Sequence, residues 1–229
     1  MNFDIAIIGG GPAGYNAAAQ ASDQGLQVVL FERATLGGVC LNEGCIPTKS
    51  LLHAAHLYHD VASSAALGIE IEGSVKADYS CIAAHKDEVV KTLTSGVAYK
   101  MKQHGVTVVP ASARLEGQEG ELIRVATDTD TYLVRYVLLA TGSETVIPPI
   151  SGLDGVSYWT SREALAATEL PKDIAIIGGG VIGMEFADVY ASLGVPVTVI
   201  EMAPEILGAM DKETSGTLRK LFKKRGVKF

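Results

Sequence analysis

A short apolar run that ends in glycines, followed by a second apolar run, is the clearest pattern along the chain. The first run covers residues 3–8, and a second run follows at residues 27–31. Runs without polar alternation are typical of parallel strands that are buried on both faces. Residues 12–24, between the two runs, predict a helix that is closed by Gly25. The order strand, helix, strand predicts an α/β fold with a parallel sheet.

Weaker patterns predict further elements in the first two thirds of the chain. A helical stretch carries two closely spaced cysteines and runs to about Asp60, and Asp78 is a suitable N-cap for a long helix that ends near His104. The remaining apolar runs predict a strand at residues 106–109, a hairpin formed by residues 121–125 and 132–135, and a buried strand at residues 136–140.

The first strand–helix–strand pattern is repeated later in the chain. Residues 4–11 recur letter for letter as residues 173–180, which lie 169 positions further on. The alignment continues without a gap until Glu32 meets Glu201. The sequence therefore predicts two Rossmann-like nucleotide-binding units.

A proline-rich loop separates the two repeats. Pro148 and Pro149 begin this loop, so we place a domain boundary there and expect domains of residues 1–147 and 148–229. Residues 214–224 predict a helix, and the last five residues open like another strand. Because an unfinished strand would leave an edge prone to pairing, we expect the chain to be a piece of a longer protein with its second unit truncated.

The glycines of the first repeat have the spacing of a dinucleotide-binding turn. Gly9, Gly11 and Gly14 follow a strand and open a helix, where glycine allows a tight turn, close approach to a pyrophosphate and close helix–strand packing. The helix N-terminus adds free N–H groups for the phosphates. Glu32 follows Gly14 by 18 residues, and its carboxylate can accept hydrogen bonds from ribose hydroxyls. The alternative is a structural turn with an ordinary surface glutamate.

The second repeat has the same residues in the same order. Gly178, Gly180 and Gly183 form the turn, and Glu201 takes the place of the ribose-binding acid. A 2′-phosphate would need Arg or Lys there, and the three residues that follow Glu201 include neither. The second unit is therefore expected to bind NAD rather than NADP.

The two closely spaced cysteines are the chemically richest feature. Cys40 and Cys45 would have Cα atoms roughly 8.6 Å apart on an ideal helix, whereas a disulfide needs less than about 7 Å. Either the pair is not bridged, or the helix is distorted there, which Gly44 and Pro47 would permit. Lys49 would favour a reactive thiolate. Inert thiols and half a metal site are the alternatives, and no second Cys/His pair at zinc spacing accompanies the first.

Composition narrows the cellular setting and the partners. The 229 residues include 48% hydrophobic ones and carry a net charge of −7 with no basic stripe, which argues against nucleic acid and anionic membrane partners. No apolar stretch reaches the roughly 18 residues of a membrane span, and we recognise no signal peptide. Three cysteines fit a reducing cytoplasm, where a disulfide is usually catalytic.

Residues 41–49, Leu-Asn-Glu-Gly-Cys-Ile-Pro-Thr-Lys, resemble the flavoprotein disulfide reductases, and most closely their dihydrolipoamide dehydrogenase branch. Glutathione and mercuric reductases more often have Val in place of Leu41 and Ile46. The resemblance implies FAD in residues 1–147 and NAD(H) in residues 148–229. It also implies that electrons pass from dihydrolipoamide through the cysteine pair to FAD and then to NAD⁺.

The resemblance also implies roles for single residues. Cys40 would be the interchange thiol that attacks lipoamide, and Cys45 would be the thiol against the flavin. Lys49 would lie beside the isoalloxazine and pair with Glu185. Val39 departs from the more common Thr and lacks its hydroxyl contact to FAD. The other positions implied at FAD are Gly9, Gly11, Pro12, Ala13, Gly14, Glu32, Gly38, Ala113, Thr141 and Gly142, and those implied at NAD are Gly178, Gly180, Gly183 and Glu201.

The family's catalytic His comes from a C-terminal interface domain of the partner subunit, and no segment here matches that domain. The resemblance therefore implies a homodimeric parent that serves the lipoyl group of a 2-oxoacid dehydrogenase or glycine cleavage complex. The chain itself is expected to lack turnover. Another disulfide reductase, of the glutathione or mercuric type, and a non-catalytic nucleotide-binding scaffold are the alternatives.

Histidines and a third cysteine are the remaining candidate site residues. His53, His56 and His59 recur every three residues, and without an evident acidic partner they indicate solvated or interface positions rather than a metal site. We expect no metal. Cys81, near the start of the long helix, is expected to be a core thiol.

Overall fold

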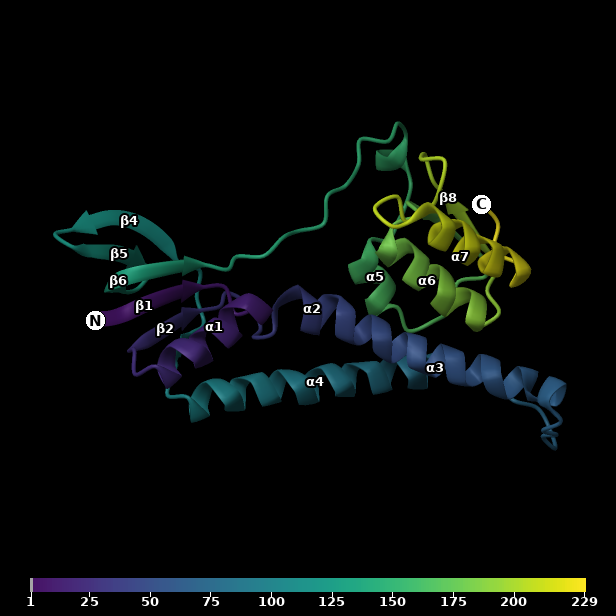
Figure 1. Ribbon diagram of the computed structural model, residues 1–229, viewed down its shortest axis with the longest axis horizontal. Coiled ribbons are helices and arrows are strands. Elements are labelled where there is room, and N and C mark those ends of the chain that lie inside the picture. The colour runs from purple at the N-terminus through teal and green to yellow at the C-terminus, as the bar shows by residue number, and fades with distance from the viewer. Residues whose placement is uncertain (1) are drawn as a thin grey trace. The chain divides into compact units, whose positions relative to one another are not determined.

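The computed structural model describes residues 2–229, which form two compact units (Figure 1). Unit 1 comprises the chain up to residue 46 together with residues 88–160, and unit 2 comprises residues 47–87 and 161–229. Each unit thus combines segments that are distant in sequence. The division into an FAD domain of residues 1–147 and an NAD domain of residues 148–229 stays a prediction.

A six-stranded sheet forms the framework of unit 1, in the order β3-β2-β1-β6-β5-β4. The strands β1 and β2 are parallel, as the first two apolar runs predicted, β3 pairs parallel with β2, and β5 pairs with β6 as the predicted hairpin. The strands are β1 (Asn2–Ile8), β2 (Val28–Phe31), β3 (Thr107–Val109), β4 (Arg114–Glu119), β5 (Leu122–Ala126) and β6 (Thr131–Leu139).

The prediction of two separate strands between residues 132 and 140 was wrong. They form the single strand β6, whose first half pairs antiparallel with β5 and whose second half pairs parallel with β1. The expectation of burial there was also wrong, because Tyr136 and Leu139 are 63% and 62% exposed. Since β5 stops pairing at Val134, the second half of β6 has β1 on one side and no other strand of residues 2–229 on its other side.

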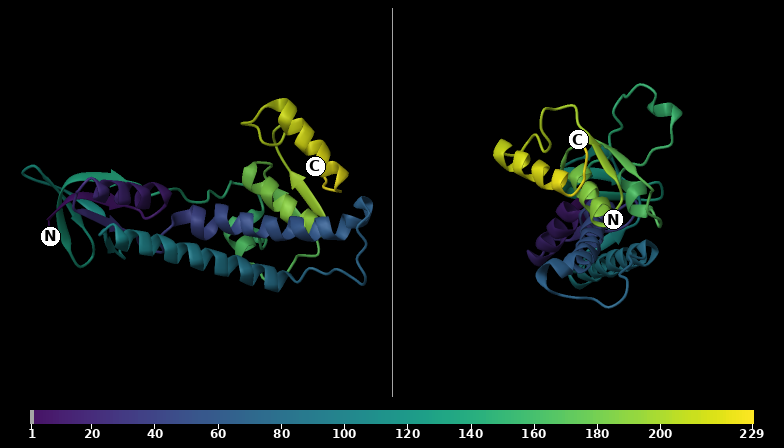
Figure 2. Two further views of the ribbon diagram at one scale, coloured as in Figure 1. Left: turned by 60° about the horizontal axis from the view of Figure 1, so that its bottom comes forward. Right: turned by 90° about the vertical axis from the view of Figure 1, so that its right-hand side faces the viewer.

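Both faces of the sheet in unit 1 carry a core. Ile7 packs with Leu30 and with residues of the helices, whereas Ala6 and Ile8 pack with Phe31 on the opposite face. Successive residues of β1 therefore face different cores, which explains why the run shows no polar alternation. Helix α1 (Pro12–Asp23) contacts β1 and β2, and it is seen beside them in Figures 1 and 2.

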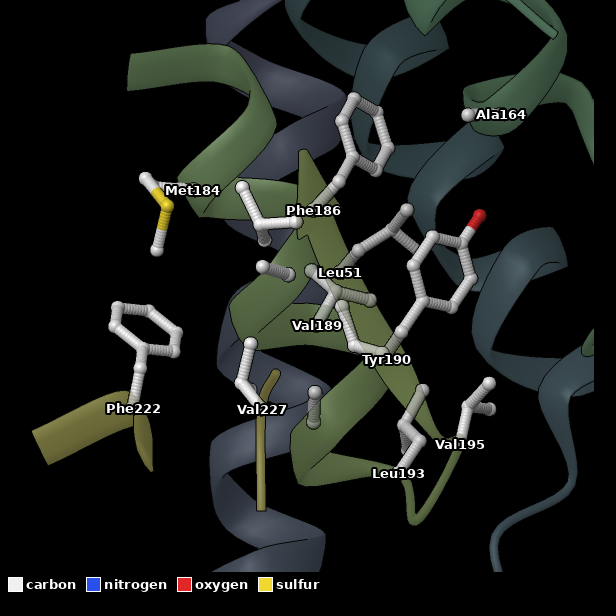
Figure 3. Close-up of a cluster of buried hydrophobic side chains, with 14 of the residues drawn as sticks. Leu51, Ala164, Met184, Phe186, Val189, Tyr190, Leu193, Val195, Phe222 and Val227 are labelled. Atoms are coloured by element: carbon white, nitrogen blue, oxygen red, sulfur yellow. The ribbon is translucent and has the colours of Figure 1, made fainter. Parts of the chain in front are cut away.

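Unit 2 contains the second repeat. The strands β7 (Ile174–Ile177) and β8 (Val197–Ile200) are parallel, and helix α6 (Val181–Ser192) connects them. Lys228 forms an isolated parallel bridge with Thr198, so the predicted strand at the last residues is present as one bridge. Figure 3 shows the core of this unit, in which Tyr190 of α6 is fully buried.

The remaining helices connect and cover the strands. Helix α7 (Lys212–Lys224) exposes the side chains of Lys220, Lys223 and Lys224. Within residues 2–229, no helix combines the length and the apolar character that crossing a membrane requires. These elements are α2 (Gly38–Glu43), α3 (Cys45–Ser63), η1 (Ser64–Leu67), α4 (Tyr79–Gln103), η2 (Leu153–Gly155), α5 (Ser161–Ala166) and α7 (Lys212–Lys224).

Candidate nucleotide and thiol sites

The first glycine turn lies between β1 and α1 and has no room for side chains at two positions. Gly9 has a φ of +108°, in the left-handed region that favours glycine, and an added Cβ atom would lie 2.1 Å from Ala140 O. A Cβ atom added to Gly14 would lie 1.8 Å from Gly9 O. Helix α1 begins at Pro12 after the N-cap Gly11. The N–H groups at the start of α1 therefore have no partner within the helix and lie at the glycine turn.

The carboxylate of Glu32 is fixed above this turn by backbone donors. Gly10 N–H donates to Glu32 Oε2 at 2.8 Å, and Ala34 N–H donates to Glu32 Oε1 at 2.8 Å. Gly10 is held from its other side as well, because its carbonyl accepts a hydrogen bond from Gly37 N–H at 2.8 Å. A carboxylate has about four lone-pair sites, so Glu32 keeps acceptor capacity for ribose hydroxyls.

The second turn repeats these contacts 169 positions later. Gly178 has a φ of +107°, and a Cβ atom added to Gly183 would lie 2.2 Å from Gly178 O. Glu201 accepts from Gly179 N–H and from Ala203 N–H, both at 2.7 Å. The backbone hydrogen bonds from Ala203 and then Gly179 hold the pKa of Glu201 below its ordinary value, so this carboxylate is ionised at neutral pH.

The structural repeat extends beyond the aligned sequence. Leu207 N–H donates to Gly179 O at 2.8 Å, as Gly37 does to Gly10. Leu207 has a φ of +53° and is the one non-glycine residue with positive φ in the described chain, whereas Gly37 has a φ of +105°. The sequence alignment would place Ile206 opposite Gly37, so the second loop is one residue longer and the correspondence was missed.

The two turns differ in what covers them. The chain after β6 lies against the first turn, where Thr141 Cα would be 3.2 Å from a Cβ atom on Gly9. A Cβ atom on Gly178, by contrast, would meet nothing within 4 Å among the described residues. Thr141 and Gly142 are exposed and border the first turn. Ala113 packs against the core on one face of the sheet in unit 1.

The cysteine segment packs directly on the first turn. Gly38 has a φ of +60°, and a Cβ atom there would lie 2.7 Å from Gly11 Cα. Val39, next in α2, is 45% exposed. Cys40 is the third residue of α2, so the contact fixes the thiol-bearing helix against the turn that is predicted to hold phosphates.

The helix is interrupted between the two cysteines, which is one of the two possibilities that the distance argument left open. Helix α2 ends at Glu43, and α3 begins at Cys45. Gly44 folds back on the preceding turn, because a Cβ atom added to it would lie 3.0 Å from Val39 O and 3.4 Å from Cys40 Cα. Cys40 is half-buried, whereas Cys45 is an exposed free thiol.

Lys49 lies one turn after the start of α3 and forms an ion pair in unit 2. Its Nζ donates to Glu185 Oε1 of α6 at 2.8 Å, which is the pair that the resemblance implied. The Lys49 side chain is 63% exposed and that of Glu185 is 26% exposed. The position of Lys49 beside a flavin stays a prediction.

A second polar cluster on α3 and α6 was missed from the sequence. His56 Nε2 lies 2.9 Å from Asp188 Oδ2, and Arg225 Nη1 donates to Asp188 Oδ1 at 2.7 Å. Burial raises the pKa of Asp188, but the hydrogen bonds from His56 and Arg225 outweigh it and hold the pKa below its ordinary value. His56 therefore has an acidic partner, contrary to expectation. His56, Asp188 and Arg225 come from three separate segments of the sequence, so no local sequence pattern predicts that they meet.

The other candidate residues stay apart. His53 and His59 are exposed on α3, and residues 2–229 contain no group of three His, Cys, Asp or Glu side chains arranged to hold a metal ion. Cys81 is an exposed free thiol, so the expectation of a core thiol was wrong. The start of α4 instead buries Tyr79 and Ala83, which places Cys81 on the outer side of that helix.

Comparison with known proteins matches nearly the whole chain to one family. The family described as "Pyridine nucleotide-disulphide oxidoreductase" matches residues 3–229. The dihydrolipoyl dehydrogenase of Acholeplasma laidlawii is 41% identical and is matched over 98% of this chain and 67% of the relative. The enzymes of the same name from Bacillus subtilis and Pseudomonas aeruginosa are 40% and 42% identical, over 97% and 99% of this chain and 49% of each relative.

A solved structure supports the fold assignment. The Cu(II) complex of the HOCl-induced flavoprotein disulfide reductase RclA from Escherichia coli has a TM-score of 0.81 and 28% sequence identity. The match covers 100% of this chain and 48% of that chain. The chain thus spans about half the length of that protein and of most of the curated relatives that it matches.

Proposed function

Because the chain belongs to the pyridine nucleotide-disulphide oxidoreductase family, we propose that it is part of a dihydrolipoamide dehydrogenase. In this proposal the turn at Gly9–Gly14 holds FAD, the turn at Gly178–Gly183 holds NAD, and Cys40 and Cys45 form the redox-active disulfide. The contact between Gly38 and Gly11 is the observation that carries the proposal, because it joins the thiol-bearing helix to a dinucleotide turn. The relatives named dihydrolipoyl dehydrogenase support the choice of substrate.

The residues present fit an adenine dinucleotide at the first turn. Gly11 keeps the backbone bare where a pyrophosphate would approach, because a Cβ atom there would contact only Gly38 Cα, at 3.6 Å, and the exposed Pro12 and Ala13 leave the start of α1 accessible. Glu32 is already oriented by two backbone donors, so it can accept from a ribose without reorganisation. Bound FAD would accept two electrons and deliver them to NAD⁺ as a hydride.

The chain's own part in the reaction is disulfide exchange. A dihydrolipoamide thiolate attacks Cys40 Sγ of the Cys40–Cys45 disulfide, which forms a mixed disulfide and releases the Cys45 thiolate. The second dihydrolipoamide thiol then displaces Cys40, so oxidised lipoamide leaves and two protein thiols remain. Lys49 lies one helical turn after Cys45 on α3, where its ammonium donates to Glu185 Oε1 at 2.8 Å.

The assignment of FAD to the first turn is tested by matched glycine substitutions. A Cβ atom on Gly11 would have ordinary contact, 3.6 Å from Gly38 Cα, and one on Gly180 would meet nothing within 4 Å. Both alanine variants should therefore fold. We expect Gly11→Ala to weaken FAD binding at least about tenfold, or roughly 1.4 kcal/mol, because the methyl group occupies the path of the pyrophosphate. Gly180→Ala should leave FAD binding unchanged.

Equilibrium dialysis of the 229-residue chain with FAD measures both variants against wild type. Equal affinity for FAD in wild type and Gly11→Ala would show that this turn does not hold the cofactor. The reciprocal experiment with NADH should reverse the order, so that Gly180→Ala loses affinity and Gly11→Ala does not.

The cofactor preference of the second turn follows from Glu201. Its ionised carboxylate can accept from the adenosine ribose of NADH and repels the 2′-phosphate of NADPH. We expect NADH to bind more tightly than NADPH by about 1–3 kcal/mol, the size of a hydrogen bond to a charged group. Glu201→Gln should narrow this difference, whereas Glu32→Gln should not change it. Tighter binding of NADPH by wild type would contradict the assignment.

The setting of the parent enzyme belongs to the same proposal. We infer a homodimer in the cytoplasm that reoxidises the lipoyl group of a 2-oxoacid dehydrogenase or glycine cleavage complex. The relatives that are called dihydrolipoyl dehydrogenase support the lipoyl group as the substrate in this proposal. Substrate profiling of the full-length protein with lipoamide, glutathione disulfide and mercuric ion separates it from the other disulfide reductases.

A further inference from the structure

Asn42 directs its side-chain amide at the start of the helix that carries it. Its Nδ2 donates to Gly38 O at 3.0 Å, to Leu36 O at 3.1 Å and to Thr35 O at 3.5 Å. The carbonyls of Thr35 and Leu36 precede α2, so they have no place in the hydrogen-bond ladder of that helix. One side chain thus donates to two carbonyls of the loop that leads into the cysteine segment and to the carbonyl of the first residue of α2.

The other end of the same amide faces a neighbouring helix. Asn42 Oδ1 accepts from Thr94 Oγ1 of α4 at 3.4 Å, and all of these residues belong to unit 1. This contact is longer than the one to Gly38, so the donors of Asn42 provide its main attachment.

The loop needs such donors because of its backbone. Gly37 and Gly38 are consecutive residues in the left-handed region, with φ of +105° and +60°, and this conformation turns neighbouring carbonyls toward Asn42. Gly38 also lies against Gly11, so a change in this loop moves α2 relative to the first turn.

We propose that Asn42 is a positioning residue that sets how readily Cys40 and Cys45 form their disulfide. The inference rests on the proposed function, in which these two thiols exchange. Helix α2 has six residues, too few to be stable by itself, so its shape depends on contacts with the rest of the chain. Loss of the Asn42 donors frees the turn that carries Cys40 and lowers its effective concentration at Cys45.

Glutathione provides a test that needs neither flavin nor lipoamide. One cysteine thiolate attacks glutathione disulfide, which forms a mixed disulfide and releases one glutathione thiol. The second cysteine thiolate displaces the other glutathione, so the chain loses two electrons and one glutathione disulfide becomes two thiols. The equilibrium constant of this exchange reports the position of the two cysteines relative to each other.

The experiment uses the 229-residue chain in a Cys81→Ser background, equilibrated in glutathione buffers, trapped by alkylation and weighed by mass spectrometry. Asn42→Asp preserves the side-chain shape but replaces both donors by an acceptor. We expect it to lower the equilibrium constant for the Cys40–Cys45 disulfide about tenfold, which corresponds to about 30 mV for a two-electron couple. Thr94→Val removes only the hydrogen bond to Asn42 Oδ1 and leaves both donors of the amide in place, so it should stay within about twofold of wild type.

Each outcome of this experiment decides either the role of Asn42 or the proposed function. An equilibrium constant for Asn42→Asp within twofold of wild type, with an unchanged circular dichroism spectrum, overturns the role of Asn42. If Asn42→Asp does not fold, Asn42→Ser, which retains one donor, decides: a loss of threefold or more supports the role and a wild-type constant overturns it. A wild-type chain that forms no Cys40–Cys45 disulfide at any glutathione ratio instead overturns the proposed function.

Discussion

Gly14→Ala is expected to lower the free energy of unfolding by about 3 kcal/mol or more, at the upper end of the cost of overpacking. The new Cβ atom would lie 1.8 Å from Gly9 O, which is a backbone atom and cannot rotate away. Gly9 cannot retreat either, because the position of its own missing Cβ atom is 2.1 Å from Ala140 O. The strain therefore spreads into the β1–α1 unit, and the first nucleotide site should be lost with it.

The second repeat provides a matched substitution. Gly183→Ala places a Cβ atom 2.2 Å from Gly178 O, but nothing lies within 4 Å of a Cβ atom at Gly178 itself. Gly178 has space to shift, so we expect a smaller loss of about 1–2 kcal/mol. The difference between the two variants measures how firmly the chain after β6 holds the first turn.

Urea unfolding followed by circular dichroism checks these values. Gly96→Ala is the control, because a Cβ atom there meets nothing within 4 Å inside helix α4. It should raise the free energy of unfolding by about 0.5–1 kcal/mol, since alanine is the better helix former. A Gly14→Ala variant that unfolds at the same urea concentration as wild type would show that the turn is more compliant than its packing indicates.

The sequence predicted the parts of the fold that depend on neighbouring residues. The runs at β1 and β2, the glycine turns and the cap at Asp78 are all local, because a strand's burial on both faces or a turn's need for glycine is encoded where it occurs. For Cys40 and Cys45, helix geometry left two possibilities, an unbridged pair or a distorted helix, so the break between α2 and α3 was one of two outcomes that the sequence allowed.

Features that depend on distant partners could not be predicted in this way. Strand β4 is exposed along its whole length, so it shows no apolar run, and only its pairing with β5 defines it. The attachment of His56 to Asp188 joins two helices that are 132 positions apart in sequence. The contact of Gly38 with Gly11 likewise depends on the path of the loop between β2 and α2.

Cys40→Ser is expected to abolish covalent capture of lipoamide when FAD is bound, whereas Cys45→Ser is expected to retain it. The accessibility of the two thiols makes this a demanding prediction, because Cys45 is exposed whereas Cys40 is half-buried. If Cys45 is the thiol that the flavin covers, bound FAD should slow alkylation of Cys45 at least about tenfold and leave Cys40 within about twofold, since reaction follows access to the thiolate.

The measurement combines both variants in a Cys81→Ser background with lipoamide and saturating FAD. In Cys45→Ser, the Cys40 thiolate opens the lipoamide disulfide, and alkylation of the freed lipoamide thiol traps a mixed disulfide that mass spectrometry detects. In Cys40→Ser, the remaining thiol is covered and no adduct should form. Omission of FAD is the control, because an exposed Cys45 should then react. An adduct that persists in Cys40→Ser with FAD and is missing from Cys45→Ser would reverse the two roles, since the flavin would then shield Cys40 and leave Cys45 to meet the substrate.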